Sequence, residues 1–198
     1  MQPTLQDPAG RRADEPAPLY RKLLPTERDT FLAHLLRLDA ADRRLRFCTS
    51  ATDLAIRDYC ERKDWWKTTT LGCFIGGTLR GAAELVRIEG AYPAKAELAI
   101  TVEKPHQDRG IGTALLARAL TLARNRYIGS VVMICLAENR KMRHIAHKFG
   151  AELDFGEGET EGRLWPPFPT IASYIEEAAM ESEAIFRLSF ETAARKPG

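Results

Sequence analysis

The sequence predicts a mixed α/β fold of the α+β kind, in which helices flank a central, mostly antiparallel sheet and a further helix follows at the C-terminal end. Three β-rich runs joined by short turn signals lie between residues 68 and 102 and predict an antiparallel meander. A long helical pattern and a continuous apolar run follow, which is typical of a strand buried on both faces and paired in parallel. The 198 residues, 44% apolar and 28% charged, suffice for one domain with an extension and exclude wholesale disorder.

The N-terminal part combines an irregular arm with three short helices. Residues 1–18 contain four prolines and little apolar content, which predicts a disordered arm. Thr26 followed by Asp29 begins a helix, because a hydroxyl with an acidic residue three positions later matches a capping box. Asp39 and Ser50 are expected to cap a second and a third helix.

The meander consists of three strands with glycine-containing or proline-containing turns between them. We expect strands at residues 68–75, 81–88 and 96–102. Gly76 and Gly77 form the first turn, since adjacent glycines tolerate the positive φ angles of a tight hairpin.

The second half alternates helices and strands. A helix is expected over residues 110–127, a buried strand over 131–137 and another helix over 140–148. Gly150 is placed to end the last of these helices in the left-handed conformation. Residues 151–164 are expected to form a strand pair interrupted by glycines.

A final helix follows three prolines, and it defines a C-terminal helical extension at residues 166–198 after a domain at residues 19–165. Ser173 with Glu176 is expected to cap it. We expect the helix to pack on its own domain, and a homodimer contact is the alternative. Its expected packing face is the apolar stripe formed by Ile171, Ile175, Ala179, Phe186 and Phe190.

Charge and cysteine usage limit the classes of partner. Lys and Arg number 29 against 27 Asp and Glu, so the net charge of +2 predicts neither nucleic acid nor an anionic membrane as a partner. We see no apolar run of about 18 residues that could span a membrane and no secretory signal at the start. The four cysteines form no CxxC pair and have no metal-ligand spacing, so we expect reduced structural thiols, no metal and a cytoplasmic location.

The turn from Gln107 to Gly112 is the most informative stretch, since it joins a strand directly to a helix. Two glycines let the backbone approach a bulky anion, and the helix N-terminus offers unpaired N–H groups and a partial positive charge. These features predict a pyrophosphate cradle. A dinucleotide fold would need a third glycine where Leu115 stands, and the lysine of a P-loop is missing.

The order of elements and the Gln-x-x-Gly-x-Gly turn resemble the GNAT superfamily of acetyl-CoA-dependent N-acetyltransferases, over residues 20–165. The resemblance implies that acetyl-CoA is the cosubstrate and that residues 19–165 form the acetyltransferase domain. It also implies that the preceding strand pairs its main chain with the pantetheine arm through Ile100 and Val102, and that Asn139 is the asparagine that follows the fifth strand. The implied pyrophosphate turn comprises Gln107, Asp108, Arg109, Gly110, Ile111 and Gly112, with Thr113 in the first turn of the helix.

Short matches favour one branch of this superfamily. Leu45-Arg46-Phe47, the run 96–99 and the run 138–142 followed by Gly150 are similar to the catalytic domain of bacterial Pat-type protein lysine acetyltransferases. This resemblance implies a primary amine as the acceptor, either a protein lysine or a small molecule.

Two carboxylates are candidates for the general base. A lysine amine has a pKa near 10.4, so removal of its proton at neutral pH contributes strongly to the rate. Glu97 is the first candidate because it lies on the strand before the turn and matches the catalytic glutamate of the Pat-type pattern; a salt bridge with Lys95 or Arg87 is the structural alternative. Glu84 is the second candidate and could also bind a cationic substrate, whereas Glu103 is expected to be solvated.

The usual general acid is missing. Many GNAT enzymes have a tyrosine seven positions after the asparagine to protonate the leaving thiolate, and Ala146 stands there. His147 is the next residue, and a core or surface role is expected for it. Packing is likewise expected for Trp65 and Trp66, with the substrate entrance as the alternative. The competing function is a non-catalytic regulatory module that binds acyl-CoA.

Overall fold

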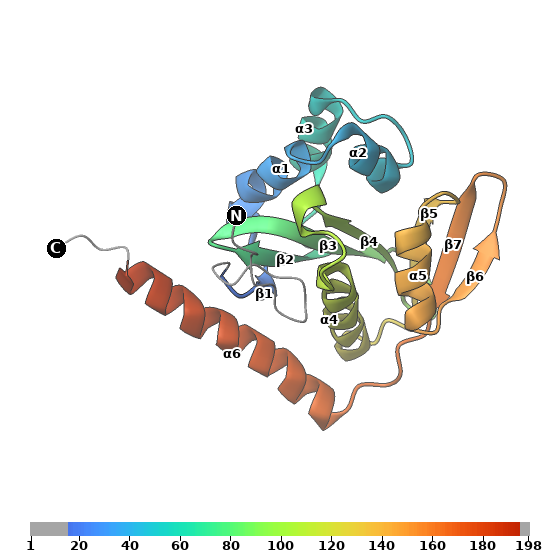
Figure 1. Ribbon diagram of the computed structural model, residues 1–198. Helices are drawn as coiled ribbons and strands as arrows, with labels where there is room; N and C mark the ends of the chain where they lie inside the picture. The colour runs from blue at the N-terminus through green and yellow to red at the C-terminus, as the bar shows by residue number, and fades with distance from the viewer. Residues whose placement is uncertain (1–15, 195–198) are drawn as a thin grey trace, which may run out of the picture.

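The computed structural model describes the backbone of residues 16–194 and the side chains of residues 16–182, so most of the expected arm lies outside the described part. One seven-stranded sheet has the order β1-β2-β3-β4-β5-β7-β6, and every neighbouring pair is antiparallel except β4 and β5 (Figure 1). The strands are β1 (Leu19–Lys22), β2 (Thr68–Ile75), β3 (Thr78–Ile88), β4 (Lys95–Val102), β5 (Ser130–Leu136), β6 (Glu152–Phe155) and β7 (Glu159–Leu164). The helices are α1 (Arg28–Leu36), α2 (Ala40–Phe47), α3 (Asp53–Arg62), α4 (Ile111–Asn125), α5 (Arg140–Lys148) and α6 (Ile171–Ala194), with 3₁₀ turns η1 (Pro25–Glu27) and η2 (Lys104–His106).

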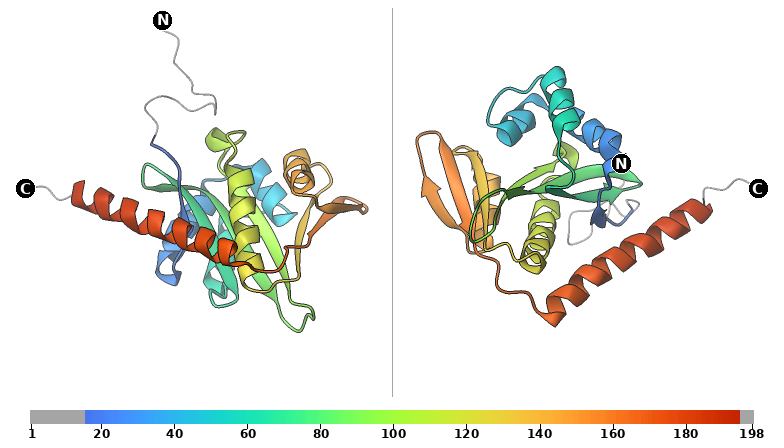
Figure 2. Two further views of the ribbon diagram at one scale, coloured as in Figure 1. Left: turned by 90° about the horizontal axis from the view of Figure 1, so that it is seen from below. Right: turned by 180° about the vertical axis from the view of Figure 1, so that it is seen from behind.

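Helices cover the two faces of the sheet unequally. Helices α1, α2 and α3 lie together over one face of the β1–β4 half, while α4 and α5 lie on the opposite face (Figures 1 and 2). Each face has its own apolar core, one centred on Leu115 and Leu116 of α4 and the other on Phe31 and Leu35 of α1. This arrangement confirms the predicted fold class, a mostly antiparallel sheet flanked by helices with a C-terminal helix.

Most predicted elements are present, with four local differences. Thr26 does not cap α1 as expected: it lies within η1, and the N-cap of α1 is Glu27, which makes no side-chain capping hydrogen bond. Thr52, not Ser50, caps α3, because its side chain accepts a hydrogen bond from the backbone N–H of Ala55. β1 was not predicted, since four residues show no alternating pattern, yet it pairs with β2 at the sheet edge. The pair predicted after Gly150 exists, but its second strand, β7, is the neighbour of β5.

The pairing of β4 with β5 ends after a short parallel ladder. Only residues 95–97 of β4 pair with residues 130–132 of β5, although β4 continues to Val102 and β5 to Leu136. Beyond Glu97 the two strands therefore share no ladder, and their main-chain groups on the facing edges are left for other partners.

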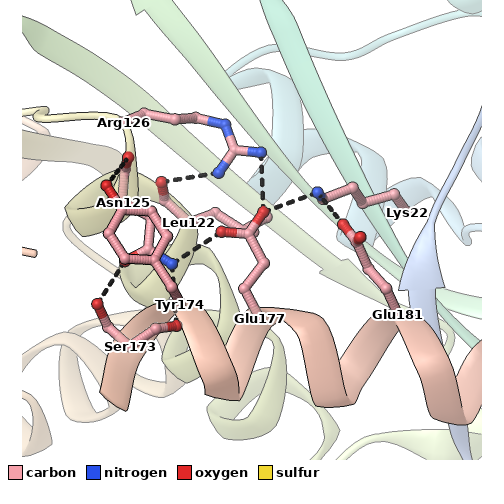
Figure 3. Close-up of polar contacts among 8 residues, drawn as sticks. All are labelled: Lys22, Leu122, Asn125, Arg126, Ser173, Tyr174, Glu177 and Glu181. Atoms are coloured by element: carbon pink, nitrogen blue, oxygen red, sulfur yellow. Dashed lines mark hydrogen bonds and ion pairs between the residues drawn. The ribbon is translucent and has the colours of Figure 1, made fainter. Parts of the chain in front are cut away.

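Helix α6 packs on α4 and β1 through a polar face (Figure 3). Thr170 and Ser173 exchange side-chain-to-backbone hydrogen bonds, so the capping box begins three residues before the expected one. The prediction that the apolar stripe packs on the domain is wrong for the described residues, since Ile171 is 82% and Ile175 63% exposed. Ser173 and Glu177 contact Asn125 of α4 instead. The side chains of Phe186 and Phe190 lie outside the described residues. Within the described part, every helix is too short or too polar to cross a membrane.

Candidate active site

The turn before α4 has the backbone geometry of an anion cradle. Asp108 and Gly110 have φ angles of 59° and 77°, a region that glycine adopts without strain. Gly110 is also the N-cap of α4 and offers no capping side chain, so the first N–H groups of the helix are left for an external acceptor. Space at Gly110 is open, whereas a Cβ on Gly112 would lie 3.1 Å from Cδ1 of Ile145.

Side-chain hydrogen bonds hold this turn in place. Gln107 Nε2 donates to both carboxylate oxygens of Asp42 at 3.0 Å and to the carbonyl of Val102 at 2.9 Å. Lys141 Nζ donates to Gln107 Oε1 at 3.0 Å and to Asp108 Oδ2 at 2.6 Å. The turn is thus tied to α2, β4 and α5, which leaves its backbone as the surface available to a ligand.

A cavity of about 340 Å³ lies in front of the turn, beside the length of β4 that no longer pairs with β5. Most residues that the resemblance assigned to coenzyme binding line it: Ile100, Val102, Gln107, Asp108, Gly110, Ile111, Gly112, Thr113 and Asn139. Arg109 is not among the lining residues; its Nη1 lies 3.2 Å from His106 Nδ1. Asn139 also caps α5, because its side chain accepts a hydrogen bond from Met142 N–H.

The cavity has further walls that the sequence did not identify. They come mainly from α2 and α5, and Leu38 lies two residues before α2. The lining residues are Leu38, Asp42, Leu45, Arg46, Thr101, His106, Lys141, Met142, His144 and Ile145. The sequence contains one indication of this wall: Asp42 and Arg46 are four positions apart, so they lie on the same face of a helix. Such a charged pair on a short helix is normally solvated, so spacing alone could not place it on a cavity.

Helix α2 follows β4 from the turn toward Glu97. Asp42 contacts Gln107 at one end, and Arg46, one turn later, contacts Glu84. Cys48 ends the helix; burial raises its pKa, and the nearby carboxylates of Glu159 and Glu97 contribute to the rise.

Glu97 stands at the point where β4 and β5 separate. It is the last residue of β4 that pairs with β5, opposite Val132, and its side chain is exposed. The predicted alternation is confirmed, because Leu98 and Ile100 lie in the core on the other face. Among the described side chains, the Glu97 carboxylate forms no ion pair with Lys95 or Arg87, the structural alternative considered from the sequence.

Glu84 has a very different environment. It is 2% exposed; its Oε2 accepts from Arg46 Nη2 at 2.5 Å, and its Oε1 accepts from Tyr59 Oη at 2.9 Å and from Lys63 Nζ. Burial acts to raise the pKa of Glu84, but the charges and hydrogen bonds of Arg46 and Lys63 outweigh it and lower the pKa. A carboxylate held ionised in this way is a weak base, so the geometry favours Glu97 over Glu84 for proton removal.

Glu103 is buried, contrary to expectation. It is 4% exposed and accepts from Arg37 Nε at 2.8 Å and Arg80 Nη1 at 2.9 Å. His34 Nδ1 lies 3.1 Å from Glu103 Oε1, and its Nε2 lies 2.8 Å from Thr101 Oγ1. Burial opposes ionisation of Glu103, yet hydrogen bonds from His34, Arg80 and Arg37 lower its pKa to about 2. This cluster fixes the end of β4 to α1.

The other residues considered from the sequence lie outside the cavity lining. Ala146 is buried against β7, near Gly162, and His147 is exposed. Trp65 packs edge-on against Phe31, as expected. The packing expected of Trp66 is wrong, because its side chain is 98% exposed. The four cysteines are free thiols whose pKa values are raised, chiefly by burial, as expected of structural residues.

The sequence profile of the acetyltransferase (GNAT) family matches residues 34–151, which include the turn, the cavity and both candidate carboxylates. The chain belongs to the GNAT acetyltransferase family. It is therefore an acetyltransferase. A search of the curated proteins returns no match.

Solved structures share the GNAT fold at low identity. The GNAT domain of Pat from S. lividans superposes with a TM-score of 0.64 at 22% identity, covering 74% of this chain and 89% of that one. YncA from Salmonella typhimurium, solved with its cofactor acetyl-CoA, gives a TM-score of 0.57 at 16% identity and covers 78% and 96%. The PaiA N-acetyltransferase from Thermoplasma acidophilum, solved with coenzyme A, gives 0.57 at 18% identity and covers 75% and 99%.

Proposed function

We propose that the chain transfers the acetyl group of acetyl-CoA directly to a primary amine, with Glu97 as the general base. The observation that carries the proposal is a cavity beside the length of β4 that no longer pairs with β5. An uncapped helix N-terminus lies at the cavity near Gly110. Glu97 is not among the lining residues; it stands on β4 where the pairing with β5 ends, three residues before Ile100, which lines the cavity. The coenzyme ligands of YncA and PaiA support acetyl-CoA as the donor.

The residues present suit the coenzyme. Backbone N–H groups of the turn and of the first turn of α4, ending at Thr113, would hold the pyrophosphate, because they combine unpaired donors with the positive end of the helix dipole. The open space at Gly110 leaves room for a bulky anion at this point. Ile100 and Val102 lie on the length of β4 that pairs with β3 but not with β5. The main-chain groups of Ile100 and the N–H of Val102 can therefore pair with the amides of the pantetheine arm, while the Val102 carbonyl already accepts from Gln107.

In the proposed reaction, Glu97 accepts a proton from the ammonium of the acceptor, and the neutral amine attacks the thioester carbon. Glu97 is suited to this task because its carboxylate is exposed and has no cationic partner among the described side chains. Glu84 is already bonded to two cations. The acceptor is a protein lysine or a small amine, and the likeness to Pat-type enzymes favours the protein lysine.

The experiment combines binding with turnover. Calorimetric titration with acetyl-CoA is followed by thiol release in the presence of lysine peptides and small amines. Glu97→Gln should bind acetyl-CoA like the wild type but lose about 10²- to 10⁴-fold in turnover. Glu61→Gln, an exposed glutamate on α3, is the matched control and should keep full activity.

Two results would contradict parts of this proposal. Unchanged turnover in Glu97→Gln would remove Glu97 as the base. Binding of acetyl-CoA without amine-dependent thiol release from the wild type would favour the second candidate function, a regulatory module that binds acyl-CoA, which the missing tyrosine at Ala146 also favours.

A further inference from the structure

A buried ion cluster lies beside the cavity on the α1–α3 side of the sheet. It consists of Arg46, Lys63, Glu84 and Tyr59, and is called the Glu84 cluster below. Burial and the carboxylate raise the pKa of Tyr59, so its phenol stays neutral. Lys63 Nζ lies 4.9 Å from the ring centre of Phe31, over a face that stabilises an ammonium. Two cations thus share one carboxylate, which leaves an excess of positive charge largely shielded from bulk water.

Arg46 brings that charge to the cavity wall. Its side chain lines the cavity, although only 11% of it is exposed to solvent. Its hydrogen bonds to Glu84 and to Tyr59 both come from Nη2. Its Nε is buried and has no hydrogen-bond partner among the described residues. The guanidinium is therefore held in place on one side and retains donor capacity on the other.

The position of Arg46 along the cavity is fixed by the strand register. Glu84 pairs with Ala99, which lies between Val102, beside the turn, and Glu97. With a rise of about 3.3 Å per residue, Ala99 is roughly 10 Å from Val102 and roughly 7 Å from Glu97 along the strand. Arg46 therefore lies between the cradle and the proposed base, the stretch in which the thioester must react.

We propose that Arg46 is a catalytic residue that stabilises the negative charge on the coenzyme A sulfur as the thioester breaks; this inference rests on the proposed function. The amine nitrogen forms a bond to the acetyl carbon, and the C–S bond breaks. The bonding electron pair leaves on sulfur as a thiolate. Glu97, which is exposed, has passed the first ammonium proton to solvent before the attack, and it accepts the second proton that the nitrogen loses as the amide forms. Glu84, Lys63 and Tyr59 are positioning residues for Arg46.

Two physical arguments support this role. The thioester is neutral before reaction, so a cation beside it gains most when sulfur becomes anionic, and such differential stabilisation raises the rate. The cluster is also preassembled and shielded from water, where a charge acts more strongly than in solvent. Ala146 supplies no proton to the thiolate, so charge stabilisation by Arg46 would take the place of the missing acid.

The first test measures the thiol pKa of bound coenzyme A from the ultraviolet absorbance of its thiolate. In the wild type, the bound thiol should titrate about 1 to 3 pH units below the free thiol, the size of effect expected of a nearby cation. Arg46→Gln should abolish this shift. Arg44→Gln is the matched control, because Arg44 is on the same helix but is 46% exposed and pairs with Glu138.

The second test separates catalysis from binding. Arg46→Gln should lower kcat by about 10²- to 10³-fold, as loss of a charge-stabilising donor does, with an unchanged Kd for acetyl-CoA. Arg46→Lys, which keeps the charge, should recover most of the loss. Should Arg46→Gln fail to fold, the double variant Arg46→Gln/Glu84→Gln removes one charge of each sign. It should show the same loss of kcat and should likewise lack the shift of the bound thiol pKa.

The contrary outcomes are distinct. Equal thiol pKa values in the wild type and in Arg46→Gln, both with coenzyme A bound, would overturn the role of Arg46 and leave the proposed function standing. A loss of about 10²-fold or more in Glu84→Gln, with wild-type kcat in Arg46→Gln, would overturn it too and make Glu84 the base. Failure of the wild type to bind coenzyme A would instead refute the proposed function.

Discussion

Two carboxylates in this molecule, Glu84 and Glu177, have nearly the same partners but lie in opposite settings. Each accepts from two cations and one neutral donor. Glu177 on α6 is held by Lys22 Nζ at 2.8 Å, Asn125 Nδ2 at 2.8 Å and Arg126 Nη2 at 3.1 Å, and these residues with Glu177 are called the Glu177 cluster (Figure 3). The Glu84 side chain is 2% exposed, whereas that of Glu177 is 16% exposed, and its neighbour Glu181 also pairs with Lys22.

The difference shows that position, not partner chemistry, decides what such a cluster does. In the Glu177 cluster, Glu181 and water compensate the positive charge of Lys22. The contacts therefore join α6 to β1 and α4 and leave no charge without a counter-ion or solvent. In the Glu84 cluster, neither cation is well solvated, and one of them lines the cavity. A buried ion pair gives little net stability because desolvation opposes the attraction, which fits a cluster retained for chemistry.

The largest expected effect comes from truncating each carboxylate. Glu84→Ala leaves Arg46 and Lys63 buried without a counter-ion, so it should lower the free energy of unfolding by about 3–5 kcal/mol. Glu177→Ala should lower it by about 1 kcal/mol at most, since water can solvate the freed cations. Urea unfolding monitored by circular dichroism measures both, and Glu176→Ala, exposed on the same helix, is the control. Equal losses for the two truncations would mean that burial does not separate the clusters.

Acid should weaken the Glu177 cluster over a defined range. Burial acts to raise the pKa of Glu177, but bonds from Lys22 and Asn125 and the charge of Arg126 outweigh it, and the pKa falls from its ordinary 4.5 to about 2. A pKa lowered by folding adds stability above the unfolded value, and that stability is lost as the pH falls from about 4.5 toward 2.

The comparison of variants isolates this contribution. The difference in free energy of unfolding between the wild type and Glu177→Gln should be largest above pH 4.5 and shrink toward pH 2. Glu103, whose pKa is also about 2, is present in both proteins, so its contribution cancels. Glu176→Gln serves as the control. A difference that stays constant over this range would show that ionisation of Glu177 does not contribute to holding α6.

The sequence predicted the cradle because its parts are contiguous. The turn, its glycines and the helix N-terminus all lie within residues 107–113, so local rules sufficed to place a strand before the turn and a helix after it. The Glu84 cluster could not be predicted in this way. Arg46, Lys63 and Glu84 come from α2, the end of α3 and β3, and no local pattern brings them together.

The prediction of the packing face of α6 failed for a related reason. An apolar stripe predicts burial when the opposing surface is apolar. Here α4 and β1 present Asn125, Arg126 and Lys22, and these polar groups select the face that carries Ser173 and Glu177. The identity of the opposing surface depends on the sheet order, which placed β1 at the edge beside β2.

Salt should have the smallest effect and should separate the clusters most cleanly. The Debye length falls from about 30 Å at 0.01 M to about 3 Å at 1 M ionic strength, so only charges in contact with solvent are screened. The stability difference between the wild type and Glu177→Gln should therefore shrink by a few tenths of a kcal/mol, roughly the worth of an exposed pair. The difference between the wild type and Glu84→Gln should change less, since the side chains of Glu84, Lys63 and Arg46 are only 2%, 3% and 11% exposed. A Glu84→Gln difference that falls with salt as much as the Glu177→Gln difference would show that water and ions reach Arg46, and the cluster could then not act on sulfur as a shielded charge.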